Sequence, residues 1–213
     1  MKLADLERGF GRRLARVATN AVVARPNLWR GFRWLLRRQF DRLAPNWNAM
    51  RGPHALAALE QALEAIPEPP RRVLDLGTGT GAAAFAAARR FPMAEVVGAD
   101  LAERMLAEAR AQTPPELAGR VRFQAADASR LPFEDSAFDL VVLANMIPFF
   151  DELARVVARG GRVALTFSAG PETPIWVPPE RLRHELGARG FTDFADFEAH
   201  GATALLAQRS DRA

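Results

Sequence analysis

The sequence of 213 residues contains no cysteine and no tyrosine, and Lys2 is its only lysine. The lack of cysteine excludes disulfide bonds, a thiolate nucleophile and cysteine-ligated zinc. The three histidines, His54, His184 and His200, are widely spaced and follow no ligand pattern, so we expect no metal site. Because all other basic residues are arginines, we interpret the high arginine content first as a coding bias rather than as a sign of function.

Long hydrophobic runs are also missing. No stretch approaches the roughly 20 apolar residues of a membrane-spanning helix. The N-terminus carries Asp5, Glu7 and Arg8 and lacks the apolar core of a signal peptide, so we expect a cytoplasmic protein. A hydrophobic content of 49% nevertheless argues against disorder and for a sizeable core.

Charge divides the chain near residue 52. Residues 1–52 hold 12 basic and 3 acidic residues, a net charge of +9, whereas residues 53–213 hold 17 basic and 22 acidic residues, a net charge of −5. We therefore predict a basic helical extension over residues 1–52, followed by a mildly acidic domain over residues 53–213.

Short apolar strands alternate with helical patterns through this second region. Strands are predicted at Arg72–Leu76, Glu95–Ala99, Val121–Ala125, Phe138–Ala144, Arg162–Phe167, Phe191–Phe197 and Ala202–Gln208. Helices are predicted at residues 53–67, Ala82–Arg90, Ala102–Gln112, Phe149–Ala158 and Pro179–Arg189, with Gly160 and Gly161 ending the fourth. The alternation indicates a doubly wound α/β domain with a seven-stranded, mostly parallel sheet, and the short last link indicates a C-terminal antiparallel hairpin.

The first predicted strand runs directly into a glycine-rich turn, DLGTGTG at residues 75–81. Glycines permit positive φ and a close approach to a ligand, and the following helix presents free N–H groups and the positive end of its dipole. The G-x-G-x-G spacing differs from the G-x-G-x-x-G of dinucleotide-binding turns, and the carboxylate of Asp75 would repel a pyrophosphate. The turn suits a ligand that carries both an ammonium and a carboxylate, as an amino acid does.

Four segments in order give the chain a resemblance to class I S-adenosylmethionine-dependent methyltransferases, in particular to their ubiquinone/menaquinone C-methyltransferase-like branch. The segments are VLDLGTGTG at 73–81, VVGAD at 96–100, FQAADA at 123–128 and LPFEDSAFD at 131–139. The resemblance covers residues 71–167 well. It implies a Rossmann-like sheet, S-adenosyl-L-methionine as the cofactor and methyl transfer as the reaction.

The resemblance also implies roles for individual residues. Asp75 would pair with the methionyl ammonium, and Asp100 would accept hydrogen bonds from both ribose hydroxyls. Asp127 would accept one from the adenine amino group, beside the N–H of Ala128. Further cofactor contacts are implied for Gly77, Thr78, Gly79, Gly81, Leu101, Met105 and Asn145.

Other interpretations of these residues stay open. Asp100 also fits an N-cap of the next helix, Asp127 a plain turn residue and Met105 a core residue. Two features depart from the family pattern. Ala102 stands where a serine is common, and Asn145 is followed by proline and phenylalanine only three positions later, unlike the N-P-P-[YF] of enzymes that methylate amino groups of nucleic acids.

No catalytic residue can be assigned from the sequence. Methyl transfer from a sulfonium is an in-line displacement with an activated leaving group, so alignment supplies most of the acceleration. A general base is needed only for some acceptors. His184 is the nearest base candidate in the downstream region, and a surface position on a helix explains it as well.

The extension supplies candidates for a lid. Residues 28–43 predict an amphipathic helix whose apolar face comprises Leu28, Trp29, Phe32, Leu35, Leu36, Phe40 and Leu43. Trp34 falls instead among arginines. We expect this helix to dock on its own domain, while contact of its basic side with an anionic membrane or with nucleic acid remains an alternative. Phe40 and Trp47 resemble the aromatic entry segment of the quinone branch, and we add Trp176 as a third lid or substrate candidate.

Taken with the aromatic segments, the motifs favour methyl transfer to a small, hydrophobic or aromatic acceptor. The sequence leaves two alternatives open. One is a nucleic-acid methyltransferase, acting chiefly on RNA, that uses the basic extension. The other is a non-catalytic module that binds S-adenosylmethionine.

Overall fold

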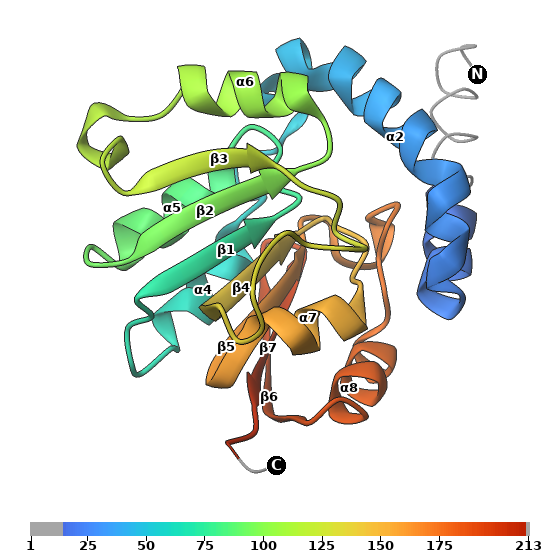
Figure 1. The fold of residues 1–213 in the computed structure, drawn as a ribbon, viewed down its shortest axis with the longest axis vertical. Coiled ribbons are helices and arrows are strands. Elements are labelled where there is room, and N and C mark those ends of the chain that lie inside the picture. The colour runs from blue at the N-terminus through green and yellow to red at the C-terminus, as the bar shows by residue number, and fades with distance from the viewer. Residues whose placement is uncertain (1–14, 212–213) are drawn as a thin grey trace.

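A computed structural model describes residues 15–211 and forms a seven-stranded sheet covered by helices on both faces (Figure 1). The strand order is β3-β2-β1-β4-β5-β7-β6. The strands are β1 (Arg72–Leu76), β2 (Glu95–Asp100), β3 (Val121–Ala125), β4 (Phe138–Ala144), β5 (Val157–Phe167), β6 (Phe191–Ala199) and β7 (Ala202–Arg209). The first five pair in parallel, and β7 is antiparallel to both β5 and β6. The predicted α/β sheet with its C-terminal hairpin is confirmed.

The described residues include the helices α2 (Trp29–Leu43), α3 (Trp47–Met50), α4 (Ala57–Glu64), α5 (Ala82–Arg90), α6 (Glu103–Ala111), α7 (Phe150–Val156) and α8 (Pro179–Gly187). Residues 15–24 are also helical. Short 3-10 turns occur at η1 (Pro26–Leu28), η2 (Ala44–Asn46), η3 (Pro115–Leu117) and η4 (Gly170–Glu172). The part of the predicted extension over residues 1–14 lies outside the described residues.

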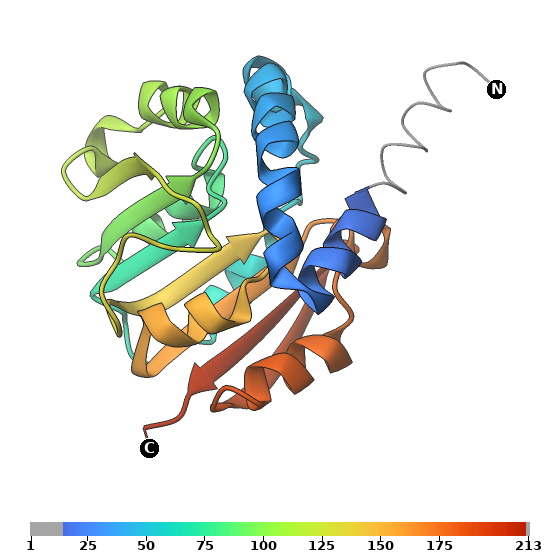
Figure 2. The ribbon, with the colours of Figure 1, turned by 45° about the vertical axis from the view of Figure 1, so that its right-hand side comes forward.

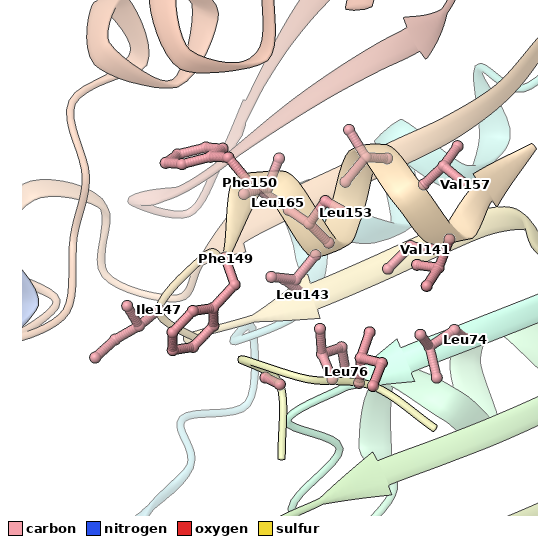
Figure 3. Packing of buried hydrophobic residues seen from close by; sticks show 14 of the residues in the cluster. Leu74, Leu76, Val141, Leu143, Ile147, Phe149, Phe150, Leu153, Val157 and Leu165 are labelled. Carbon is pink, nitrogen blue, oxygen red and sulfur yellow. The ribbon is translucent and has the colours of Figure 1, made fainter. Parts of the chain in front are cut away.

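The core has two layers because successive strand residues point to opposite faces of the sheet. In β1, Val73 belongs to a buried cluster with side chains of α4 and α5, whereas Leu74 belongs to a cluster with side chains of α7 and α8. Figure 3 shows Leu153 of α7 directed toward Leu143 of β4 in this second cluster. Strands buried on both faces explain why the sequence reads as short, nearly continuous apolar runs.

The end of α7 differs from the prediction. The helix stops at Val156 and β5 begins at the next residue, so Gly160 and Gly161 lie inside a strand rather than at a helix end. The pairing of β4 with β5 shifts register in this region, and Gly160 has a φ of 72°. A bulge with a left-handed residue favours glycine, which accounts for the sequence signal.

The carboxyl ends of the parallel strands meet at one edge of the sheet. β1 lies between β2 and β4, so the chain winds outward in opposite directions from this point, which is where open α/β sheets bind ligands. Figures 1 and 2 both show α2 outside the sheet, along the edge to which the strands point.

α2 docks on the domain through part of its predicted apolar face. Trp29 is buried, and Phe32 and Leu36 pack partly buried against the core. Leu28 and Leu35, which the 100° spacing places on the same face, are instead 43% and 52% exposed. The helix therefore touches the domain through a narrower arc than its sequence pattern suggests.

No helix within residues 15–211 combines the length and the apolar character needed to cross a membrane.

Replacing Gly98 in β2 with alanine should destabilise the protein. The added Cβ would lie 2.5 Å from the ring of Phe123 and 2.8 Å from the hydroxyl of Thr78. Overpacking of this kind costs about 1–3 kcal/mol, measurable as a lower urea midpoint. Gly31→Ala in α2 is the control, because its Cβ meets nothing within 4 Å and should leave stability unchanged or higher. Equal midpoints for Gly98→Ala and the wild type would contradict this packing.

Candidate functional site

The glycine turn lies between β1 and α5 at the carboxyl edge of the sheet. Gly77, Gly79 and Gly81 have φ values of 74°, 54° and 88°, a region that residues with a Cβ rarely adopt. The N–H groups of Gly77 and Thr78 donate to the carbonyl of Ala99 at 2.8 and 3.0 Å. These bonds fasten the turn to β2, and the turn leads directly into the first residue of α5.

Asp75 is completely buried beneath this turn. Its Oδ2 accepts hydrogen bonds from the Thr78 hydroxyl at 2.6 Å and from the Ala84 N–H at 2.9 Å, whereas its Oδ1 has no partner. Burial raises the pKa of Asp75 to about 7, against the opposing effect of those two hydrogen bonds. A buried oxygen without a partner is costly, so the site favours a bound cation or a proton here.

Asp100 ends β2 and joins two segments of backbone. Its Oδ2 accepts from the Gly79 N–H at 2.9 Å, and its Oδ1 accepts from the Ala102 N–H at 2.8 Å. Burial raises the pKa of Asp100, while these backbone hydrogen bonds act in the opposite direction. Each carboxylate oxygen can accept a second hydrogen bond, which suits a ligand with two neighbouring hydroxyls.

Asp127 is held by the extension as well as by its own turn. Its Oδ1 accepts from the Trp29 indole at 2.7 Å and from the Ser129 N–H and hydroxyl at 2.9 and 2.7 Å. Its Oδ2 accepts from the Arg33 guanidinium at 3.0 Å. Burial acts to raise the pKa of Asp127, but the hydrogen bonds from Ser129, Trp29 and Arg33 together hold it below the usual range. The Oδ2 atom retains room for a further donor.

The other predicted cofactor residues surround these carboxylates in different ways. Leu101 is partly buried against the core, and Ala128 is buried in it. Met105 is buried with Ala44 and Ala102 under the extension. Asn145 has a φ of 52°, and its side chain joins β4 to β5 through hydrogen bonds with the Ser168 hydroxyl and N–H at 3.0 and 2.9 Å.

The extension closes over the glycine turn through a segment that we call the strap, residues 40–48. The Trp47 indole nitrogen lies 3.3 Å from the position that a Cβ would take on Gly79, and Phe40 packs edge-on against Trp47 at 5.6 Å between ring centroids. Asn48 accepts a hydrogen bond from the Thr80 hydroxyl at 2.6 Å. Of the three lid candidates, Trp47 is therefore at the turn and Phe40 packs against it.

The strap also supplies the cap that the sequence of α6 lacks. Ala102, which stands where the family commonly has a serine, offers no side-chain cap. Instead, the carboxylate of Asp41 accepts the N–H of Arg104 at 3.1 Å. A carboxylate at the first turn satisfies a free N–H group and interacts favourably with the helix dipole. No local pattern in the sequence identifies this contact, because its partners are 63 residues apart.

Trp176 is placed elsewhere. It lines a cavity of about 340 Å³ between α8 and strands β5 to β7, together with Arg183, Phe197 and Leu205.

Met146, which the sequence did not single out, covers the glycine turn in place of Trp176. Its sulfur lies 2.7 Å from the position that a Cβ would take on Gly77. Met146 is in the short connection after β4, whose only sequence signal is its mismatch with N-P-P-[YF].

Two histidines that are far apart in the sequence lie together. His54 and His200 are exposed and stack at 4.1 Å between ring centroids, and His184 is exposed on α8. Within residues 15–211 no group of three or more histidine, aspartate or glutamate side chains is arranged to hold a metal ion.

Comparison with known proteins agrees with this geometry. A family model described as a methyltransferase domain matches residues 73–163. A demethylmenaquinone methyltransferase of Roseiflexus castenholzii is 32% identical over 164 residues, which make up 69% of this chain and 68% of that protein. A demethylmenaquinone methyltransferase of Thermus thermophilus is 48% identical over 117 residues, 51% of this chain and 52% of that protein. The chain thus spans about half the length of the Thermus relative.

A solved structure of an S-adenosylmethionine-dependent methyltransferase from Aquifex aeolicus has the same fold. It aligns with a TM-score of 0.65 over 78% of this chain and 98% of that chain, at 17% sequence identity.

The folded state should become less stable as the pH rises, because Asp75 then has to lose a proton that the folded protein favours. In the unfolded chain this carboxyl ionises around the ordinary aspartate pKa of 3.8, whereas the folded protein keeps the proton up to about pH 7 because burial raises the pKa. The free energy of unfolding should therefore fall between about pH 4 and pH 7 by an amount on the order of a few kcal/mol. Urea unfolding across this interval should show a smaller fall for Asp75→Asn. Identical pH profiles for the two proteins would mean that Asp75 is already ionised in the native state.

Proposed function

Because the chain belongs to the class I S-adenosylmethionine-dependent methyltransferases, we propose that it transfers a methyl group to a small, lipophilic and aromatic acceptor of the quinol type. The observation that carries the proposal is the pair of carboxylates on either side of the glycine turn, Asp75, which is buried, and Asp100, which is partly buried. One carboxylate offers an unpartnered oxygen to a cation, and the other offers two acceptors to a diol.

The residues present fit S-adenosyl-L-methionine. The Oδ1 atom of Asp75 suits the methionyl ammonium, and the left-handed glycines keep the backbone of the turn free of side chains. Asp100 suits the ribose, and the Oδ2 of Asp127 suits the adenine amino group. The methionyl side of the cofactor would be lined by the turn residues Gly77, Thr78, Gly79 and Gly81. The proposed set of contacts is completed by Leu101, Met105, Ala128 and Asn145. When bound, this cofactor supplies a methyl group on a positively charged sulfur whose leaving group needs no further activation.

The protein's own contribution is then alignment and exclusion of water. The strap lies on the turn through Trp47 and Asn48, and Met146 covers it beside Gly77. A closed, apolar surround holds reacting atoms in line and keeps water from them, which is where most of the acceleration of such a displacement arises. This role requires no catalytic acid or base among the residues at the turn.

Apolar side chains at the carboxyl edge support a lipophilic acceptor. Phe32, Met146 and Ile175 are partly buried there and pack against the same core cluster, although they come from three separate segments. Trp29 packs edge-on against Phe149 at 5.3 Å between ring centroids. A relative 48% identical over 117 residues is named a demethylmenaquinone methyltransferase, which agrees with an aromatic acceptor.

Calorimetry with S-adenosylhomocysteine tests the cofactor site directly. Asp100→Asn should weaken binding by at least about tenfold, because a hydrogen bond to a charged group contributes about 1.5–3 kcal/mol. Glu134→Gln, an exposed carboxylate changed in the same way, should bind like the wild type.

A ligand cycle separates a direct contact from misfolding. The analogue that lacks the ribose 2′-hydroxyl should bind the wild type weakly, and Asp100→Asn should add little further loss. If the losses of binding free energy from the substitution and from the missing hydroxyl simply add, Asp100 does not contact the ribose. Absence of binding by the wild type at millimolar ligand would reject the proposed function itself.

Transfer of a radiolabelled methyl group tests the acceptor. A short-chain demethylated naphthoquinol should be methylated by the wild type, and Trp47→Ala should lower kcat/KM by roughly tenfold or more, because the strap no longer closes the turn. Trp34→Ala, which removes a tryptophan that is 65% exposed, is the matched control and should keep full activity with this soluble acceptor. Labelling of RNA in place of the naphthoquinol would assign the chain to nucleic acid, and cofactor binding without any transfer would leave a binding module.

A further inference from the structure

The side of α2 that faces away from the domain exposes large apolar side chains. Trp34 is 65% exposed and Leu35 is 52% exposed within the part of the chain that the structure describes. Together with Arg30, Arg38 and Arg42 they make up what we call the outer face of α2. Figures 1 and 2 show α2 beyond the ends of the strands instead of packed on a face of the sheet. Nothing in the proposed methyl transfer explains why a tryptophan and a leucine should be in water here.

The outer face is strongly basic. Arg30, Arg38 and Arg42 form no ion pair with a described residue, and Arg38 lies over the Trp34 ring at 5.6 Å. Asp41, the only acidic residue of α2, points to the N-terminus of α6 and accepts the N–H of Arg104. The charge of the face is therefore not balanced within residues 15–211, and it complements an anionic partner.

A shallow apolar groove lies among these arginines. Its volume is about 270 Å³, and its lining consists of Leu35, Arg38, Gln39, Arg42 and Leu43. Two leucines and the methylene stems of the arginines form its walls, so the charged heads can remain in water while the groove takes up hydrocarbon. The charged phosphate backbone of a nucleic acid offers no hydrocarbon to fill such a groove.

From this combination we propose that the outer face of α2 docks on a bilayer that contains anionic phospholipids. The arginines of the face contact headgroup phosphates, Trp34 lies at the headgroup level, and Leu35 with the groove receives acyl carbon. The opposite face of α2, through Trp29, Phe32 and Leu36, holds the helix to the domain. The helix is thus presented as a fixed surface rather than as a free amphipathic peptide.

The position of this surface agrees with a lipophilic acceptor. α2 runs along the edge where the strands end, and it contacts Asp127 through the buried Trp29 and the more exposed Arg33. Docking through the outer face would bring the carboxyl edge of the sheet close to a membrane-dissolved substrate. Only this consequence rests on the proposed function; the docking itself does not require methyl transfer.

Co-sedimentation with vesicles tests the docking without cofactor or acceptor. The full chain should bind vesicles of phosphatidylcholine mixed equally with phosphatidylglycerol, bind phosphatidylcholine alone much more weakly, and lose binding as salt is raised. Arg38→Glu/Arg42→Glu and, separately, Trp34→Ser/Leu35→Ser should each reduce the partition coefficient for the mixed vesicles by at least about tenfold.

Matched controls change the same residue types elsewhere. Arg71→Glu/Arg181→Glu reverses two arginines that lie in the domain, away from α2, and Met93→Ser removes a methionine that is 89% exposed. Both should bind the mixed vesicles like the wild type. Absence of binding by the wild type, or equal binding by the outer-face variants, would overturn the proposal.

Two further measurements distinguish the remaining outcomes. The first is binding of a single-stranded RNA. If the wild type binds this RNA but no vesicles, and the outer-face variants no longer bind the RNA, the proposal is overturned in favour of nucleic acid. Calorimetry with S-adenosylhomocysteine on the same preparations shows whether each variant is folded. If the wild type binds this ligand but does not bind vesicles, the proposed docking is refuted and the proposed function is not.

Discussion

The geometry of the glycine turn depends on the two backbone hydrogen bonds that the Asp100 carboxylate accepts. The carboxylate receives the Gly79 N–H with one oxygen and the Ala102 N–H with the other, and so fixes the glycine turn against the start of α6. Both partners are backbone groups, so the geometry is set by the ends of two strands and not by flexible side chains. This tie adds to the two hydrogen bonds from the turn to the Ala99 carbonyl and helps to hold the three glycines in their left-handed conformation. The acid at the end of β2 therefore has a structural role in the turn, beside the ligand role that we propose for it.

Much of this arrangement follows from the sequence because it is local. β1, β3, β4 and α5 have the predicted bounds, since apolar runs that alternate with glycine and helical patterns admit few other topologies. The order of the motifs alone predicts that Asp75 and Asp100 lie at the same edge of the sheet. The predicted end of α7 is wrong because a glycine pair has the same appearance in a helix stop and in a strand bulge.

Contacts that join distant segments could not be predicted. Asp41 at α6, Asn48 at Thr80 and Met146 over Gly77 each depend on where the extension or a loop finally packs. The stacking of His54 on His200 belongs to the same class, because it joins the turn before α4 to the turn between β6 and β7. Similarly, helical periodicity placed Leu35 on the apolar side of α2, but the width of the contact with the domain is a tertiary property. The positions of residues at the ends of strands are thus easier to predict than the contacts that loops and the extension make over them.

The cap of α6 has a consequence for how the chain acquires its structure. A helix whose own sequence supplies no capping side chain is less stable alone, and α6 receives its cap from a segment some sixty residues earlier. Part of the stability of α6 therefore depends on its contact with the strap, because one of its free N–H groups finds its acceptor there. Exchange of this domain between relatives as an independent module would separate α6 from the carboxylate that completes it, even though every motif of the sheet would be transferred intact.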